Sequence, residues 1–406
     1  MSPVPITPLE LRVPSHAAPS SSGRGLAIGR KGFRPFFLLA SAYAAVSVPL
    51  WVIFLGGHMQ MHSGLPPQTW HAHEMLFGYA GAVIAGFLLT AVGNWTKRET
   101  LVGLPLLGLA LAWLLARIAL LVPALPPAAV AAIDLAFLPA LAASIARPIA
   151  QTGNRRNYVM IAVLFCLWLC NLSVHLDALG VAPGQGRRAT LLALHLIVLL
   201  MLLISGRVVP MFTRNALADP SIRSIAALDR AALASVVGVA AADFIWGDTH
   251  ATPWLCALAA LCIAGRTRHW GTPAAFRDPM LWILHVGHAW IAVGFLLKAL
   301  APLTPGLAAG ALHALTAGAL GCLSLGMMAR VTLGHTGRMI AASTGTRRAF
   351  LCMVAAGALR VVAPLAPSSY LALLGVSAAL WALAFVSFLW EFAGPLAAPR
   401  RDGAPG

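Results

Sequence analysis

The sequence predicts an all-α membrane protein, a polytopic transmembrane bundle of about twelve helices with both termini in the cytoplasm. The chain has 406 residues, of which 59% are hydrophobic and only 10% are charged, and its mean hydropathy is +0.82. Soluble globular domains carry about 25% charged residues. Long apolar runs are expected to form helices, because a helix satisfies its own backbone polar groups and lipid cannot satisfy them.

Crossing a hydrocarbon core about 30 Å thick takes roughly 20 apolar residues in a helix. Twelve runs approach this length, and the eighth is the shortest. They cover residues 36–56, 74–95, 101–122, 126–148, 157–180, 189–209, 228–246, 250–265, 279–300, 308–330, 347–365 and 369–392. The predicted organisation is a weakly ordered arm at 1–30, a transmembrane domain at 31–394 and a short cytoplasmic tail at 395–406. The arm lacks the apolar stretch of a signal peptide.

The distribution of basic residues predicts the orientation. The chain contains 28 Lys and Arg residues, and its formal net charge is +16. Most of these residues fall in loops on one side of the predicted bundle, whereas the opposite loops contain just Arg187 and Arg188. Basic loops stay in the cytoplasm, so both termini are expected there. The basic excess is therefore explained by topology, and no nucleic-acid partner is expected.

Histidines inside the spans are the first candidates for function. The chain has 13 histidines, and several fall at similar depths on different predicted helices. A single intramembrane histidine more often bonds between helices than binds a metal, but a set of them favours haem iron or copper, which imidazole ligates well. The candidate haem or metal ligands are His71, His73, His195, His285, His288 and His313.

The stretch "WHAHEM" places His71, His73 and Glu74 at the outer mouth of the second span. Residues at i and i+2 lie on opposite sides of a helix but on one face of an extended segment. The two histidines therefore need not share a metal. Glu74 is the candidate catalytic residue, as a hydrogen-bond partner of an imidazole or a proton carrier. The alternative is an acid favoured by the dipole at a helix N-terminus.

A weak internal similarity links the second and tenth spans. A shift of 240 residues aligns His73 with His313, and Gly78, Gly81 and Gly86 with Gly318, Gly321 and Gly326. Small residues four apart permit close helix approach or a flat macrocycle against the backbone. Both interpretations remain open at this stage, and helix packing is favoured.

The cytoplasmic ends of several spans carry a second polar set. Arginine clusters suit carboxylates and phosphates, so this set could bind haem propionates or another anion, although positive-inside topology explains each arginine taken singly. The candidates are Arg34, Arg207, Arg214, Arg330, His335 and Asn94.

The first outer loop contains "GHMQMH", which supplies His58, Met59, Met61 and His62. Imidazole and thioether groups suit copper, so this loop is a candidate second copper site. A solvated surface loop is the commoner explanation of such a stretch.

Four blocks of the sequence together resemble the NnrS family. They are "GFRPFFLLA", "WHAHEMLFGYAGAVIAGFLLTAVGNWT", "GRVVPMFTRNAL" and "HALTAGALGCLSLGMMARVTLGHTGR". The resemblance covers residues ~28 to 392. It implies a multi-pass protein of the bacterial inner membrane that contains haem and copper. It also implies a role in denitrification and in resistance to nitric oxide and nitrosative stress.

Together these observations predict a haem b protein, with copper, that acts on nitric oxide in the lipid bilayer. Removal of nitric oxide by reductase-like chemistry would take electrons from quinol or a periplasmic donor. Two alternatives stay open: non-catalytic binding of nitric oxide, haem or copper that protects other proteins, and transport of a metal or an anion.

Overall fold

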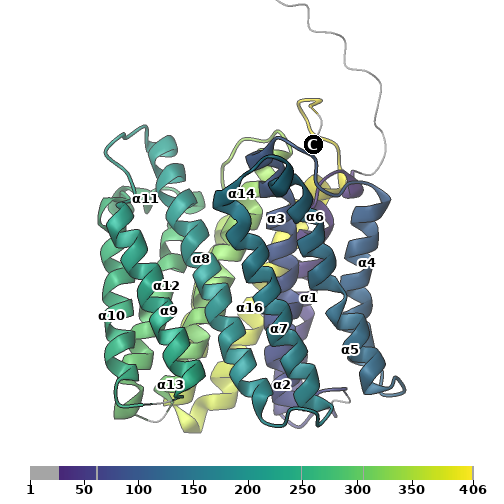
Figure 1. Ribbon diagram of the computed structural model, residues 1–406. Coiled ribbons are helices and arrows are strands. Elements are labelled where there is room, and N and C mark those ends of the chain that lie inside the picture. Colours follow the sequence, from purple (N-terminus) through teal and green to yellow (C-terminus); the bar gives the residue numbers. More distant parts are fainter. Residues whose placement is uncertain (1–26, 61–62, 248, 305, 405–406) are drawn as a thin grey trace, which may run out of the picture.

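The computed structural model describes residues 27–60, 63–247, 249–304 and 306–404. Every regular element in these ranges is helical (Figure 1). Most of the predicted N-terminal arm lies outside the described residues. In chain order the helices are α1 (Phe33–Leu55), α2 (Pro67–His73), α3 (Gly81–Thr96), α4 (Leu104–Ala119), α5 (Pro127–Leu135), α6 (Phe137–Gln151), α7 (Tyr158–Ala178), α8 (Gln185–Leu217), α9 (Ala226–Ile245), α10 (Thr252–Gly265), α11 (Thr272–Ala275), α12 (Pro279–Leu300), α13 (Leu307–His313), α14 (Gly321–His335), α15 (Thr344–Val362) and α16 (Tyr370–Ala397).

Nine helical rods within the described residues are long and apolar enough to cross a membrane. They are α1, α2–α3, α5–α6, α7, α8, α12, α13–α14, α15 and α16. The chain is therefore an all-helical, multi-pass membrane protein. The helices α4, α9 and α10 lie beside these rods in the same bundle (Figure 1), and a count of twelve crossings stays a prediction.

Two of the rods have the same internal construction. A π-helical segment, Glu74–Ala80, joins α2 to α3, and a second one, Ala314–Leu320, joins α13 to α14. The three pieces of the first rod start at residues 67, 74 and 81, and those of the second start at 307, 314 and 321. The offset of 240 residues seen in the sequence is therefore an offset between two matching rods. π-Helical segments within α-helices often lie at functional sites.

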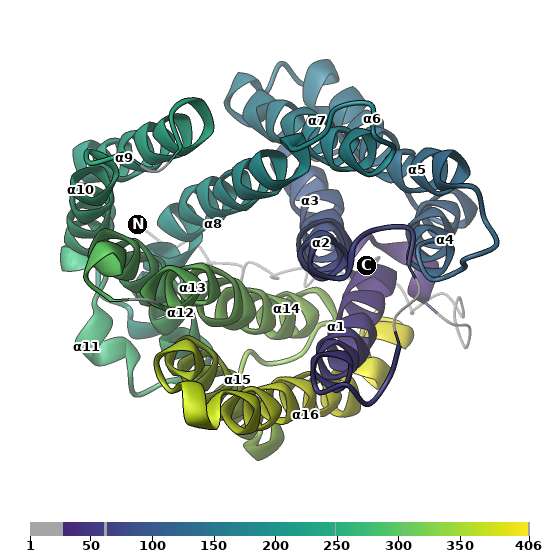
Figure 2. The same cartoon turned by 90° about the horizontal axis from the view of Figure 1, so that it is seen from below.

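Three rods form the inside of the bundle. The most apolar windows of α2–α3, α13–α14 and α8 are 83%, 72% and 61% buried, whereas that of α1 is 28% buried. Viewed along the bundle, α3, α8 and α14 lie toward the middle and the other long helices surround them (Figure 2). Since these three rods carry His71, His73, His195 and His313, their packing decides where those side chains point.

The rods are arranged in a ring of three successive sets. The rods form three successive sets of four, and each inner rod is the second of its set. The sets are α1, α2–α3, α4 and α5–α6; then α7, α8, α9 and α10; then α12, α13–α14, α15 and α16. The last rod of each set packs against the first rod of the next, as α6 does on α7, α10 on α12 and α16 on α1. The bundle is thus closed by contact between its first and last long helices.

The glycines of the inner rods are helix-packing positions. A Cβ atom on Gly86 would lie 2.7 Å from the Phe37 ring, and one on Gly318 would lie 2.6 Å from the Trp290 indole. Gly326 faces Ile283 in the same way. Side chains of neighbouring helices therefore fill this glycine face, and the packing interpretation of the repeated glycines is the one that the structure supports.

Both ends of the described chain lie at one end of the bundle. The amide of Ala27 donates to the carbonyl of Ala397 at 2.7 Å. Arg34 donates to the carbonyls of Leu396 and Ala398 at 2.8 and 2.7 Å, which satisfies the C-terminal turn of α16. We call this end the terminus end and the opposite end, where α2 and α13 begin, the far end (Figure 1).

Substitution of Gly318 by Leu should destabilise the protein. The new side chain would overlap Trp290 and the close approach of Gly357, whose Cβ position lies 3.0 Å from the Cα of Gly318. Overpacking of this kind costs about 1–3 kcal/mol. Gly108→Leu on the exposed face of α4, where a Cβ meets nothing within 4 Å, is the matched control. Thermal unfolding in detergent should show a lower Tm for Gly318→Leu alone, and equal Tm values for the two variants would contradict the packing.

Candidate functional site

The two histidines of "WHAHEM" lie on one helix and face in different directions. Both belong to the last turn of α2, so their side chains are about 200° apart around the helix axis. His71 stacks on the Trp51 indole, with ring centroids 4.6 Å apart and planes inclined by 5°. His73 is 1% exposed and points toward α5 and α7. They therefore belong to two separate sites.

His71 lines a cavity between α1, α2, α8, α13, α15 and α16 and the two π-helical segments. The cavity volume is about 220 Å³. Its lining is mostly apolar, with His71, His313 and Arg360 as the basic groups. We call it the His71–His313 cavity.

His313 is held in a defined tautomer. Its Nδ1–H donates to the carbonyl of Ala309, one turn earlier, at 2.7 Å. The proton is therefore on Nδ1, and the lone pair of Nε2 is available. A backbone carbonyl that orients an imidazole in this way is typical of metal-ligating histidines.

Arg360 brings a positive charge into this cavity from α15. Its Nη1 is buried and has no hydrogen-bond partner among the described residues, and the same is true of His71 Nδ1. An arginine within a membrane-spanning helix is costly, so such a residue usually marks a functional site. The cavity thus combines two imidazoles with a guanidinium that can bind an anion.

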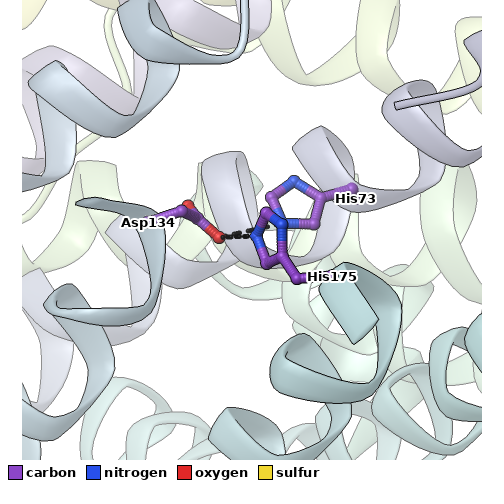
Figure 3. A group of neighbouring side chains, drawn as sticks. All are labelled: His73, Asp134 and His175. Carbon is purple, nitrogen blue, oxygen red and sulfur yellow. Dashed lines mark hydrogen bonds and ion pairs between the residues drawn. The ribbon is translucent and has the colours of Figure 1, made fainter. Parts of the chain in front are cut away.

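His73 belongs to a buried polar group that we call the His73 cluster. Its Nε2 lies 3.0 Å from Asp134 Oδ2 and 2.8 Å from Asn171 Oδ1. His175 Nε2 also lies 3.0 Å from Asp134 Oδ2. Figure 3 shows both imidazoles pointing at the same carboxylate. These three side chains come from three helices, α2, α5 and α7, and could hold a metal ion.

Glu74 and Arg117 complete the His73 cluster. Arg117 pairs with both Glu74 and Asp134. Glu74 also accepts from His73 Nδ1 at 2.9 Å and from the Tyr43 hydroxyl. The Glu74 side chain is fully occupied and does not line the His71–His313 cavity. The arrangement therefore favours a structural role for Glu74 over that of a proton carrier to the cavity.

The structure places His195 outside the cavity. Its Nδ1 donates to the carbonyl of Leu191 at 2.8 Å, and its Nε2 lies 3.3 Å from Asp243 Oδ2. Lys298 pairs with the same carboxylate. His195 thus bridges α8, α9 and α12 and is not brought together with His71 and His313.

His285 and His288 also form their own contacts. His285 bonds to the hydroxyls of Thr213 at 2.9 Å and Thr272 at 3.0 Å. His288 Nδ1 lies 3.0 Å from Ser205 Oγ. Both face α8 from α12, and neither lines the cavity.

The polar set expected to bind haem propionates lies away from the cavity, and none of its six members is among the described residues that line it. Arg34 bonds to the end of α16, as described above. Arg207 donates to Asn157 at 3.2 Å, and Arg330 lies over the Phe212 ring, 4.1 Å from its centroid. Asn94 and His335 are 3.5 Å apart, and Arg214 is exposed.

The outer-loop candidates are only partly described. His58 is exposed and Met59 is half-buried just after α1. Met61 and His62 lie outside the described residues, so the loop copper site stays a prediction.

Sequence reasoning missed the residues that complete both sites. Arg360 and Trp51 belong to the His71–His313 cavity, and Arg117, Asp134, Asn171 and His175 belong to the His73 cluster. A usable signal existed, because an ionisable residue inside a span is a functional hypothesis by default. Arg117, Asp134 and Arg360 all meet that criterion.

These features define a polytopic α-helical membrane protein with two buried, histidine-containing sites near one end. The chain belongs to the NnrS family, whose model, described as NnrS protein, matches residues 27–400. No curated protein matches the sequence. Family membership confirms the resemblance found in the four sequence blocks and suggests a protein of the nitric oxide response.

Replacing Arg117 by Gln should destabilise the fold, because Glu74 and Asp134 would be left as buried, unpaired carboxylates. Breaking a buried ion pair costs about 3–5 kcal/mol. We expect a clearly lower Tm in detergent, and partial recovery when Glu74→Gln is added. Arg188→Gln, at an exposed position near the start of α8, is the control. An unchanged Tm for Arg117→Gln would refute the importance of the pairing.

Proposed function

We propose that this chain is a haem protein of the bacterial inner membrane that removes nitric oxide, with haem b held in the His71–His313 cavity. The observation that carries the proposal is the meeting of two imidazoles and one guanidinium, whose buried Nη1 has no hydrogen-bond partner among the described residues, in a mostly apolar cavity. The two imidazoles come from the two matching rods, α2–α3 and α13–α14.

The chemistry of these residues fits a haem. His313 presents a free Nε2, and His71 has a buried nitrogen without a partner. Arg360 has a buried N–H that a propionate carboxylate would satisfy.

Each residue has a separate role in this proposal. When bound, the haem supplies an iron centre that binds nitric oxide and exchanges electrons. Trp51 fixes the ring plane of His71, and the Ala309 carbonyl holds His313 in the Nδ1–H tautomer. The apolar walls exclude water and admit nitric oxide, a small neutral molecule that partitions into lipid. Arg360 neutralises a carboxylate in a medium where charge is costly.

Removal of nitric oxide is proposed as reductive coupling, 2 NO + 2 e⁻ + 2 H⁺ → N₂O + H₂O. Quinol or a periplasmic protein would supply the electrons. Copper is the second proposed cofactor of the chain. One observation favours the alternative of non-catalytic binding: Glu74, the acid nearest to His71 in sequence, is enclosed by Tyr43, His73 and Arg117, so it offers the cavity no ready proton.

The proposal includes a topology. The helices α4, α9 and α10 would also cross the bilayer, which makes twelve crossings with both termini in the cytoplasm. Two observations support it: the two ends of the described chain meet at the terminus end, and most basic loops precede or follow helices at that end. The His71–His313 cavity would then lie in the periplasmic half of the membrane.

Histidine variants test the haem site. His71→Ala and His313→Ala should each lower the haem content and alter the Soret band of protein purified in detergent. His195→Ala and His285→Ala remove buried histidines outside the cavity and are the controls. Full haem retention with an unchanged spectrum in both cavity variants would overturn the site, and absence of haem from the wild type would overturn the proposed cofactor.

An assay of gas products tests the reaction. Reduced wild-type protein given excess nitric oxide should form N₂O, and His313→Ala should form at least ten-fold less. A stable complex with nitric oxide, formed without N₂O for every electron donor tried, would establish the non-catalytic alternative.

A further inference from the structure

We propose that His73, Asp134 and His175 form a binding site for a first-row transition-metal ion. This site is distinct from the His71–His313 cavity, because His73 and His71 face in different directions from α2. The proposal goes beyond the haem proposal and does not rest on it.

Three hydrogen-bond acceptors converge at this site. The Glu74 carboxylate accepts from His73 Nδ1, so a neutral His73 carries its proton there and presents a lone pair on Nε2. That lone pair faces Asp134 Oδ2 at 3.0 Å. It also faces Asn171 Oδ1 at 2.8 Å, an orientation set by the donation of Asn171 Nδ2 to Asp134 at 2.7 Å. Acceptors repel one another at such distances unless a cation lies between them.

The spacing of the donor atoms suits a metal ion. Bonds of about 2.0–2.2 Å from zinc to imidazole or carboxylate place neighbouring ligand atoms about 3–3.5 Å apart. Asp134 Oδ2 lies 3.0 Å from both imidazole nitrogens, and all three ligand atoms lie within 4.8 Å of one another. Asn171 Oδ1 is available as a fourth oxygen ligand.

The groups around the site orient these ligands. Glu74 holds His73 in the tautomer that leaves Nε2 free, a carboxylate–histidine pairing often found behind metal-bound imidazoles. Arg117 binds Asp134 Oδ1 and leaves Oδ2 to the imidazoles and to Asn171 Nδ2. The ligand atoms therefore point inward, and the other polar atoms of His73 and Asp134 are satisfied from behind.

The charges of the His73 cluster call for a cation. With both imidazoles neutral, Glu74 and Asp134 contribute two negative charges and Arg117 contributes one positive charge. The exposed fractions of these three side chains are 1%, 2% and 4%, so the uncompensated charge would be buried within the membrane. Burying such a charge costs several kcal/mol. A metal ion, or a proton on His73, removes this cost.

A surface cavity lies at the far end, on the outer side of the site. This surface cavity, about 710 Å³ in volume, has part of its wall from the residues one turn outward of each ligand. Thr69 lies four residues before His73, Val130 four before Asp134, and Ala178 three after His175. Asp177 is also in the wall, and a negative charge there favours the approach of cations.

The donor set indicates the kind of metal. Two imidazoles with one carboxylate suit Zn²⁺, Cu²⁺ or Fe²⁺. Mg²⁺ and Ca²⁺ prefer sites built of oxygen ligands. Zn²⁺ and Cu²⁺ are therefore suitable probes, and neither is confused with haem iron in elemental analysis.

The test loads the full-length protein in detergent with Zn²⁺ or Cu²⁺, removes weakly bound metal and measures metal per chain. We expect about one tightly bound ion in the wild type, and an electron paramagnetic resonance spectrum of the Cu²⁺ form that shows two imidazole nitrogens. His175→Ala should weaken binding at least ten-fold and leave one such nitrogen. His58→Ala, which removes an exposed histidine at the same end, should bind like the wild type.

Two results would overturn the proposal. Wild-type protein that binds neither metal stoichiometrically would show that the cation of the cluster is a proton, a result that does not depend on the folding of any variant. His175→Ala with undiminished affinity would place the metal elsewhere. Haem content is measured on the same samples, so a failure of the haem proposal is recognised separately from a failure of this one.

Discussion

The pairing of Arg117 with two carboxylates determines how the far end of the bundle is arranged. In a membrane interior, Glu74 and Asp134 are tolerated because this guanidinium and the imidazoles of the cluster compensate them. The pairing draws α2 toward α4 and α5 and turns His73 into the cluster. Because α2 is helical at this point, His71 then faces the opposite way, against Trp51 and into the cavity. The ion pairs thus orient His73 into the cluster, and the helical spacing of His71 and His73 places the two side chains in separate sites.

The repeated rods explain how His313 reaches the same cavity. The two rods with π-helical segments both begin at the far end, and both are mostly buried. Their glycines accept side chains from neighbouring helices, as Gly86 accepts Phe37 and Gly318 accepts Trp290. This packing keeps the backbones of the inner rods close to their neighbours. The two π-helical segments border the His71–His313 cavity.

Much of the fold could be predicted from the sequence, since it depends on local properties. The apolar runs correspond closely to the helices, because length and hydropathy are sufficient to recognise a span. The placement of His71, His73 and His313 at the same end of the bundle follows from the direction of each helix. Which site or partner each histidine faces could not be predicted. The directions in which His195, His285 and His288 point depend on Asp243, Ser205, Thr213 and Thr272, which are distant in sequence.

The sequence by itself determined that this is a helical membrane protein of the NnrS family with histidines near one end. Hydrophobicity is a property of single residues, and the family motifs are short blocks of sequence, so both can be recognised without a structure. Only the tertiary structure decided which polar groups meet: His71 with His313 and Arg360, and His73 with Asp134 and His175. The physical reason is that buried charges and imidazoles must find partners across helices. Which partners they reach depends on the rotation of each helix about its axis, and the packing of all neighbouring helices sets that rotation.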